Sequence, residues 1–231
     1  MNFIKNKVVA TLSKILILMV LVQIISPSLK AQDTYDDWGT IMSLGLSKDI
    51  TDKVSLIWQE QYRSRDNFST KELFAHSLTA TYDLCKFLSG SLGYQSYQYN
   101  SEDNGWESRQ KYLVYVTGDY DLGKLNISLR ERYQDTQWRG KESFMTKKYI
   151  MSTLKGKYDI RDCSFEPFAS AEMFSLLNDS PKLDKKWRYE IGSKYKINEH
   201  NELDIHLRYT TSGIYNKGNE GKICVGYAYV L

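Results

Sequence analysis

The chain has 231 residues, with 31 Lys and Arg against 28 Asp and Glu, and its mean hydropathy is −0.50. A formal net charge of +3 argues against a nucleic-acid-binding protein, because such proteins concentrate many basic residues on one face. The 18 Tyr, five Trp and only three Pro favour strands of alternating character over helices.

The first predicted element is an export signal. Three lysines up to Lys14 precede an apolar run over residues 15–25, and small residues follow before Gln32. This order is typical of a secretory signal peptide cleaved after Ala31, and the run is shorter than the roughly 18 residues of a spanning helix. An uncleaved anchor or a buried helix is the alternative. We therefore expect a cleaved signal peptide at 1–31 and one domain at 32–231.

From Trp38 onward, nearly every segment alternates apolar and polar residues with period two, as strands do. Leu125, Ile127 and Leu129 share one face, for example, and the residues between them are polar. The predicted strands begin near Trp38, Val54, Phe74, Leu88, Trp106, Leu125, Lys147, Phe165, Trp187, Glu202 and Lys222. Bacterial single-chain barrels have even strand numbers. We therefore expect about 10 to 12 strands, with either a short extra strand before Trp38 or a first strand that does not span.

Aromatic residues mark both ends of these strands. Tyr82, Tyr120, Tyr158 and Tyr195 recur at steps of 38, 38 and 37 residues, each just before a short turn. The opposite strand ends carry Tyr62, Trp106, Tyr133 and Trp187, and the connections there are longer and polar, such as "SRDNFSTK" and "NSEDNG". Two aromatic girdles, long strands and unequal connections predict a closed antiparallel transmembrane β-barrel in a bacterial outer membrane, with lipid as its surroundings.

The polar face of the strands is rich in cations. The residues assigned to this lumen charge cluster are Arg63, Arg109, Lys111, Arg130, Arg132, Glu190 and Arg208. Such a lumen would favour anions, as charged rings do in pores. The alternative is that the charges pair across strands and fill a narrow barrel.

No catalytic, metal or cofactor site is predicted. Ser77 directly follows His76 and therefore points to the opposite strand face. Glu60, Glu131 and Glu172 are assigned to the apolar face near the outer interface, with inward rotation at a bulge as the alternative. The three cysteines lack metal-ligand spacing, and a Cys85–Cys163 disulfide is permitted but has no support from the pattern.

The C-terminal "ICVGYAYVL" places alternate residues up to Leu231 on one face and resembles the strand signal that outer-membrane assembly machinery recognises. Glu-x-aromatic repeats, "LGYQSY", "ESR" and "EPF" resemble a family of outer-membrane barrels common in Bacteroidota, the domain of unknown function 2490 type. The resemblance implies the barrel and its location in a Gram-negative outer membrane, and transfers no activity or site residue.

Three functions remain open on the sequence. The favoured one is a non-enzymatic barrel, either a narrow pore with a basic lumen or a structural or surface component. The second is a lipid-modifying barrel enzyme that uses outward polar groups such as His76 and Glu60. The third is a soluble periplasmic ligand-binding barrel. No nucleic-acid partner is expected, and the sequence identifies no solute or protein partner.

Overall fold

The computed structural model describes residues 37–139, 144–161, 163–177, 185–211 and 218–231, so the predicted signal peptide lies outside the described part. The strands are β1 (Asp37–Thr51), β2 (Val54–Arg65), β3 (Thr70–Cys85), β4 (Leu88–Ser101), β5 (Gly105–Leu122), β6 (Leu125–Arg139), β7 (Phe144–Tyr158), β8 (Phe165–Leu176), β9 (Lys185–Lys196), β10 (Asn201–Thr210) and β11 (Glu220–Val230). No helix within the described ranges is long and apolar enough to cross a membrane.

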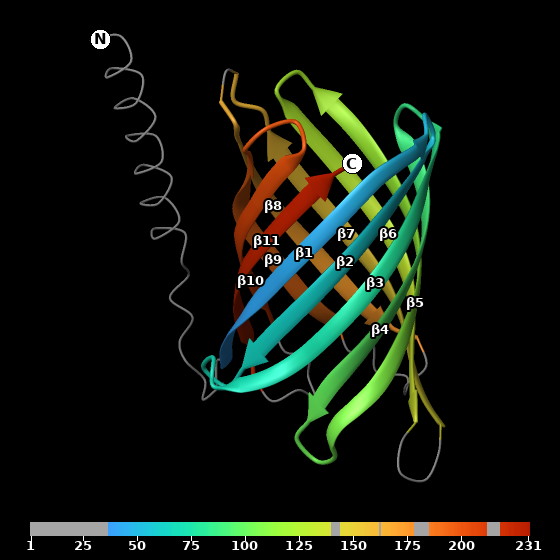
Figure 1. Ribbon diagram of the computed structural model, residues 1–231, viewed down its shortest axis with the longest axis vertical. Coiled ribbons are helices and arrows are strands. Elements are labelled where there is room, and N and C mark those ends of the chain that lie inside the picture. The colour runs from blue at the N-terminus through green and yellow to red at the C-terminus, as the bar shows by residue number, and fades with distance from the viewer. Residues whose placement is uncertain (1–36, 140–143, 162, 178–184, 212–217) are drawn as a thin grey trace, which may run out of the picture. The chain divides into compact units, whose positions relative to one another are not determined.

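The strands close into a barrel, which confirms the predicted fold class (Figure 1). Their lengths run from 10 residues in β10 to 18 in β5, and each begins within four residues of its predicted start. At about 3.3 Å per residue, even tilted strands of this length can span a hydrocarbon layer. The alternating pattern therefore predicts the strands well.

The closing strand pair accounts for the odd strand number. Ten neighbouring pairs are antiparallel, and β1 pairs with β11 in parallel from Asp37↔Glu220 to Ser47↔Val230. Both alternatives for strand parity are therefore wrong, because β1 is a full strand of 15 residues and borders β11 directly. With eleven alternating strands the first and the last run in the same direction, and a parallel ladder can still satisfy their backbone groups.

A buried lysine bonds across the closing strand pair β1–β11. Lys222 of β11 reaches over β1 and donates from Nζ to the Ser64 carbonyl at 2.8 Å and to Glu72 Oε2 at 3.0 Å. Gly39 of β1 lies beneath it, and a Cβ there would fall 2.0 Å from the Ser64 oxygen. A glycine at this position therefore lets β11, β2 and β3 be joined across β1.

The two barrel ends differ less than predicted. Turns of two residues join β1 to β2, β3 to β4 and β5 to β6 at one end, as at Leu122–Leu125, where Gly123 adopts a φ of +64°. At the other end, half of the residues in the polar stretches "SRDNFSTK" and "NSEDNG" belong to strands and not to loops. Strand ends that project beyond lipid have water on both faces, so their sequence loses the alternation that identifies a strand.

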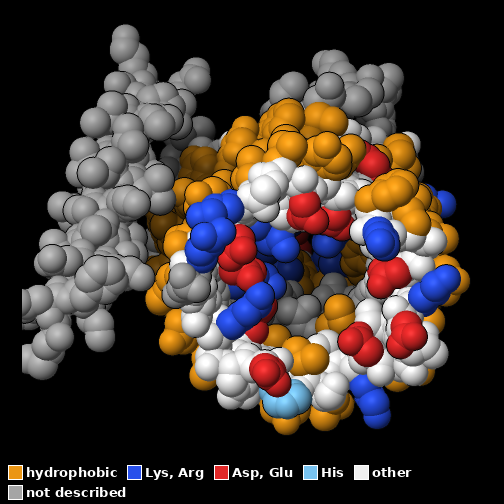
Figure 2. Space-filling view, turned by 90° about the horizontal axis from the view of Figure 1, so that it is seen from above, with side chains coloured by type: hydrophobic (Ala, Val, Ile, Leu, Met, Phe, Trp, Pro, Cys, Tyr) orange, Lys and Arg blue, Asp and Glu red, His pale blue; other side chains and the backbone are white. Residues whose placement is uncertain are grey.

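Apolar side chains cover the outside of the barrel and polar ones line its lumen, which is the reverse of a soluble protein. Large apolar residues such as Leu92, Leu129 and Ile205 are more than half exposed on the outer wall, and such exposed residues outnumber the buried apolar ones. Figure 2 shows hydrophobic side chains around the outside and charged ones around the hollow. The small buried cluster of Leu73, Ala75 and Tyr97 points inward. A continuous apolar outer band suits lipid and would be unusual on a soluble monomer.

Candidate functional site in the barrel lumen

Five cations converge in the lumen from different sides of the barrel. We call them the lumen cation cluster: Arg63 of β2, Lys111 of β5, Arg132 of β6, Arg188 of β9 and Arg208 of β10. The charge of Lys111 is repelled by Arg63, Arg132 and Arg188, and Arg188 is repelled in turn by Arg208. Like charges drawn from separate strands are therefore held within electrostatic range of one another.

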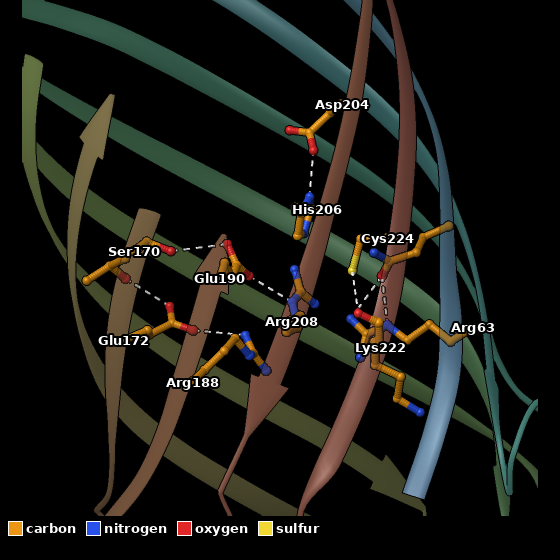
Figure 3. A network of polar contacts seen from close by, with 12 residues as sticks. Arg63, Ser170, Glu172, Arg188, Glu190, Asp204, His206, Arg208, Lys222 and Cys224 are labelled. Atoms are coloured by element: carbon orange, nitrogen blue, oxygen red, sulfur yellow. Dashed lines mark hydrogen bonds and ion pairs between the residues drawn. The ribbon is translucent and has the colours of Figure 1, made fainter. Parts of the chain in front are cut away.

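Two carboxylates lie in the lumen cation cluster. Glu172 of β8 accepts from Arg132 Nη2 at 3.0 Å, from Arg188 Nη1 at 2.8 Å and from Thr153 Oγ1 at 2.9 Å. Glu190 of β9 accepts from Arg208 Nε at 2.7 Å. Figure 3 shows Glu172 reaching toward Arg188 and Glu190 reaching toward Arg208. The five cations and these two carboxylates carry a net charge of +3, and Arg63 also lies within electrostatic range of Glu220 and of Glu72, which pairs with Lys222.

Several lumen cations bond to neutral partners. Arg63 donates twice to Gln61 Oε1, at 3.2 and 2.9 Å, and Lys111 donates to Gln95 Oε1 at 2.9 Å. Arg130 donates to Thr117 Oγ1 at 3.1 Å, and Lys155 Nζ lies 3.9 Å from the centre of the Phe168 ring. Neutral oxygens and an aromatic face hold these cations in place without cancelling their charge.

Other charges pair nearer the ends of the lumen. Arg109 binds Glu107 through Nε at 3.1 Å and Nη2 at 2.7 Å and lies over the Tyr99 and Trp138 rings. At the short-turn end, the ion pairs are Lys194–Glu202 and Lys196–Glu166. Pairing near the lumen ends is therefore local, whereas the lumen cation cluster, Arg130 and Lys155 together carry excess positive charge.

A second polar group lies in the lumen on β10 and β11. His206 Nδ1 and Asp204 Oδ1 are 2.5 Å apart, and Cys224 is opposite His206 in the strand register. The three side chains line a cavity of about 260 Å³ together with Gln59, Gln61 and Arg208. Among the described residues, no group of three or more His, Cys, Asp and Glu is arranged to hold a metal ion.

All the residues predicted for the lumen lie on strands with their side chains pointing inward, but they do not form one cluster. Arg63, Lys111, Arg132 and Arg208 meet in the centre beside Glu190, whereas Arg109 and Arg130 have separate partners. Arg188 is assigned to the inward face by the alternation of "WRYE", and the structure places it in the central group. The prediction lacked Glu172 and Lys222, of which Lys222 is signalled by the alternation of "GKIC".

Glu172 corrects the assignment of the Glu-x-aromatic repeat. Its side chain is in the lumen wall and 8% exposed, not on the apolar face. Phe174 and Phe168 also face inward, so an aromatic two residues away did not indicate lipid on this strand. Glu60 and Glu131 do lie on the outer face, because their neighbours Gln61 and Arg132 point inward.

The outer face carries a row of polar residues across three strands. Glu60 Oε2 contacts His76 Nδ1, and His76 is opposite both Glu60 of β2 and Ser96 of β4. The row lies two residues along the strands from the Tyr62–Phe74 ring pair, whose centroids are 5.1 Å apart. Glu131 makes a separate outer contact, accepting from Ser152 Oγ at 2.8 Å.

The predicted interface tyrosines all lie outside, near the short-turn end. Tyr82, Tyr120, Tyr158 and Tyr195 are each between 36% and 65% exposed. Tyr195 packs against Phe165 with ring centroids 4.6 Å apart. The three cysteines are free thiols, so the structure contains no Cys85–Cys163 disulfide.

Residues 38–219 match the family model described as protein of unknown function (DUF2490). The chain belongs to the DUF2490 family. This DUF2490 chain is similar in fold to the NanC porin, with a TM-score of 0.55 and 15% identity over 84% of this chain and 99% of that one. It is also similar to LpxR from Salmonella typhimurium, with a TM-score of 0.50 and 11% identity over 77% of this chain and 83% of that one.

No curated protein matches this DUF2490 chain in sequence. Both structural neighbours are outer-membrane barrels, and at these identities they show the fold alone.

Proposed function

We propose that this chain is a narrow pore of a Gram-negative outer membrane whose basic lumen prefers small anions. The supporting observation is the lumen cation cluster, in which five cations face two carboxylates. Rings of charge of one sign select ions of the opposite sign. The likeness to a porin fits this proposal, which assigns no reaction to the lumen.

The outer-membrane location rests on the apolar outer wall and the two barrel neighbours. We further propose export by a signal peptide cleaved after Ala31, assembly through the C-terminal strand and a Bacteroidota source, on the sequence features above. The apolar band argues against the soluble periplasmic alternative. Fractionation of cells should leave the protein with outer membranes, and heating should change its migration on gels.

Planar-bilayer recording of the refolded protein in a salt gradient tests the pore. We expect the current to reverse at a potential close to the equilibrium potential of the anion. Silence at every voltage would refute the pore and leave a structural or surface component of the membrane.

Charge-neutralising variants locate the selectivity. Lys111→Gln and Arg63→Gln each remove one positive charge from the cluster, so the reversal potential should move toward zero. Lys124→Gln makes the same change of charge in an exposed turn and serves as the matched control. Equal shifts in all three variants would show that net charge, and not the lumen, sets the preference.

A second candidate function is acyl-ester cleavage on the outer face, favoured by the Glu60–His76–Ser96 row. Glu60, His76 and Ser96 occupy one row of the strand register on the outer face, and the Glu60 carboxylate contacts the His76 imidazole. A carboxylate, an imidazole and a hydroxyl in this order are the groups that nucleophilic ester cleavage uses. Ser96 Oγ would attack an ester carbonyl while His76 takes its proton and returns it to the leaving alcohol, and water would then release the acid.

Release of fatty acid from vesicles of phospholipid and lipopolysaccharide measures this activity. His76→Ala and Ser96→Ala should each lower the rate by about 10²-fold or more. Ser152→Ala is the control, because Ser152 is an outer-face serine that bonds a glutamate and has no histidine beside it. Absence of release by the parent protein would refute the second candidate.

A further inference from the structure

Cys224 is the thiol of a carboxylate–imidazole–thiol arrangement in the lumen. Asp204 and His206 point inward from β10, and His206 pairs in register with Cys224 of β11 (Figure 3). His206 Nδ1 lies 2.5 Å from Asp204 Oδ1, and its ring makes an edge contact with Phe168 at 5.6 Å between centroids. Two contacts therefore fix the orientation of the ring.

A glycine on the neighbouring strand makes room for this arrangement. Gly192 of β9 lies opposite His206, and a Cβ there would fall 2.3 Å from the His206 Cβ and from the Ile205 carbonyl oxygen. The ring is thus held between a glycine on one side and a thiol on the other.

The second ring nitrogen of His206 is available as a base. Nε2 is buried and has no hydrogen-bond partner among the described residues. Nδ1 is committed to Asp204, and Cys224 lies opposite His206 in the strand register, where its Sγ donates to the Lys222 carbonyl at 3.9 Å. A thiolate is the nucleophilic form of cysteine, and a neighbouring imidazole that takes the proton increases its amount at neutral pH.

The thiol borders open space. Cys224 is 2% exposed but lines the cavity of about 260 Å³ with Gln59, Gln61 and Arg208. A cysteine that merely fills the barrel wall would need neither the oriented histidine nor the cavity. Charged groups around the pair are Lys194 and Glu190 of β9, Glu202, Asp204 and Arg208 of β10, Lys222 of β11, Lys155 of β7 and Arg63 of β2, whereas β1 presents neutral residues there.

We infer that Cys224 exchanges with low-molecular-weight disulfides that enter the lumen, which makes it a modification site within the proposed pore. His206 Nε2 takes the thiol proton, and the sulfur attacks one sulfur of the disulfide. A mixed disulfide forms on Cys224, and the other half leaves as a thiolate that receives the proton from His206. The inference rests on the proposed function in that the disulfide reaches the cavity through the lumen.

The test uses the full chain, refolded in lipid vesicles, with Cys85→Ser and Cys163→Ser so that one thiol remains. Dithiodiglycolate, a dianionic disulfide, is added, and the adduct is measured by intact mass. Adding Cys224→Ser should abolish the adduct. Cystamine, a dicationic disulfide of similar size, should react more slowly because of the basic lumen.

His206→Gln and the more conservative Asp204→Asn identify the base. An unassisted thiol is only a few per cent ionised near pH 7, so each variant should slow the exchange about five- to tenfold there. The rates should converge near pH 10, where the thiol ionises unaided. Heat-modifiable migration on gels checks that each variant folds.

The outcomes separate this inference from the pore. An adduct on a protein that conducts no ions would refute the pore alone. A folded protein that gives no adduct, while the denatured chain does, would refute the modification site. Equal rates near pH 7 for the parent and both variants would refute the assistance by His206.

Discussion

Replacing Glu172 by glutamine tests whether the lumen cation cluster depends on its bridging carboxylate. Glu172 accepts three hydrogen bonds, two of them from arginines on different strands. It is 8% exposed, so water replaces little of what is lost. The Glu172→Gln variant raises the net charge of the cluster from +3 to +4 and turns an amide NH₂ toward one guanidinium.

The expected cost follows from breaking a buried ion pair, which removes about 3–5 kcal/mol when one partner is lost. The glutamine carbonyl still accepts one hydrogen bond, so we expect the lower end, about 3 kcal/mol. Glu166→Gln on the same strand is the matched control. Its partner Lys196 is more than half exposed, so the cost there should be about 0–1 kcal/mol.

Urea unfolding of both variants in lipid vesicles, followed by tryptophan fluorescence, measures the difference. Bilayer recording of the same Glu172→Gln protein should show a stronger preference for anions. Equal stability of the two variants would contradict the role of Glu172 as a bridge. Unchanged selectivity would contradict the assignment of the cluster to the ion path.

Three further substitutions test the faces, the closure and the packing of the barrel. Leu129→Arg, on the outer wall, should cost about 2–4 kcal/mol in lipid, whereas Ser128→Arg on the lumen side should cost much less; the reverse order in urea unfolding would mean that the faces are wrongly assigned. Lys222→Met removes both bonds across β1 and should cost about 3 kcal/mol, and a variant as stable as the parent would show that the closure does not need them. Gly192→Ala places a Cβ against the His206 Cβ and the Ile205 carbonyl, so we expect a reduced yield of heat-modifiable barrel on refolding, with Gly156→Ala, which meets no atom closer than 3.9 Å, as control.

The sequence predicts the strands because a single physical requirement repeats along them. Lipid outside and polar surroundings inside require alternation at every spanning position, so Leu129 and Arg130 can be assigned to opposite faces by inspection. The same rule places Lys111 and Arg208 in the lumen. The tyrosines also indicate where strands begin, because each lies near the end of a spanning strand, just before the turn that leads into the next one.

Pairing inside the lumen is harder to predict, because it depends on register and on local irregularities. Glu72 faces Lys222 at a bulge between β2 and β3, and no sequence pattern places that bulge. Glu172 has aromatics on its own face, so the cue that worked for Glu60 and Glu131 failed there. The closing pair is parallel because the number of strands is odd. A single strand that is uncertain in the sequence therefore leaves the closure unpredicted.

The arrangement around Cys224 shows how strongly such a site depends on register. The spacing of Asp204 and His206 puts both side chains on one strand face from sequence alone. Cys224 joins them because β10 and β11 pair His206 with it, and a shift of one residue would turn the thiol toward lipid. The connection between these strands is longer than a tight turn, so its length does not fix the register. Gly192 fits the neighbouring β9–β10 register, because it lies opposite His206 and a Cβ there would fall 2.3 Å from the His206 Cβ.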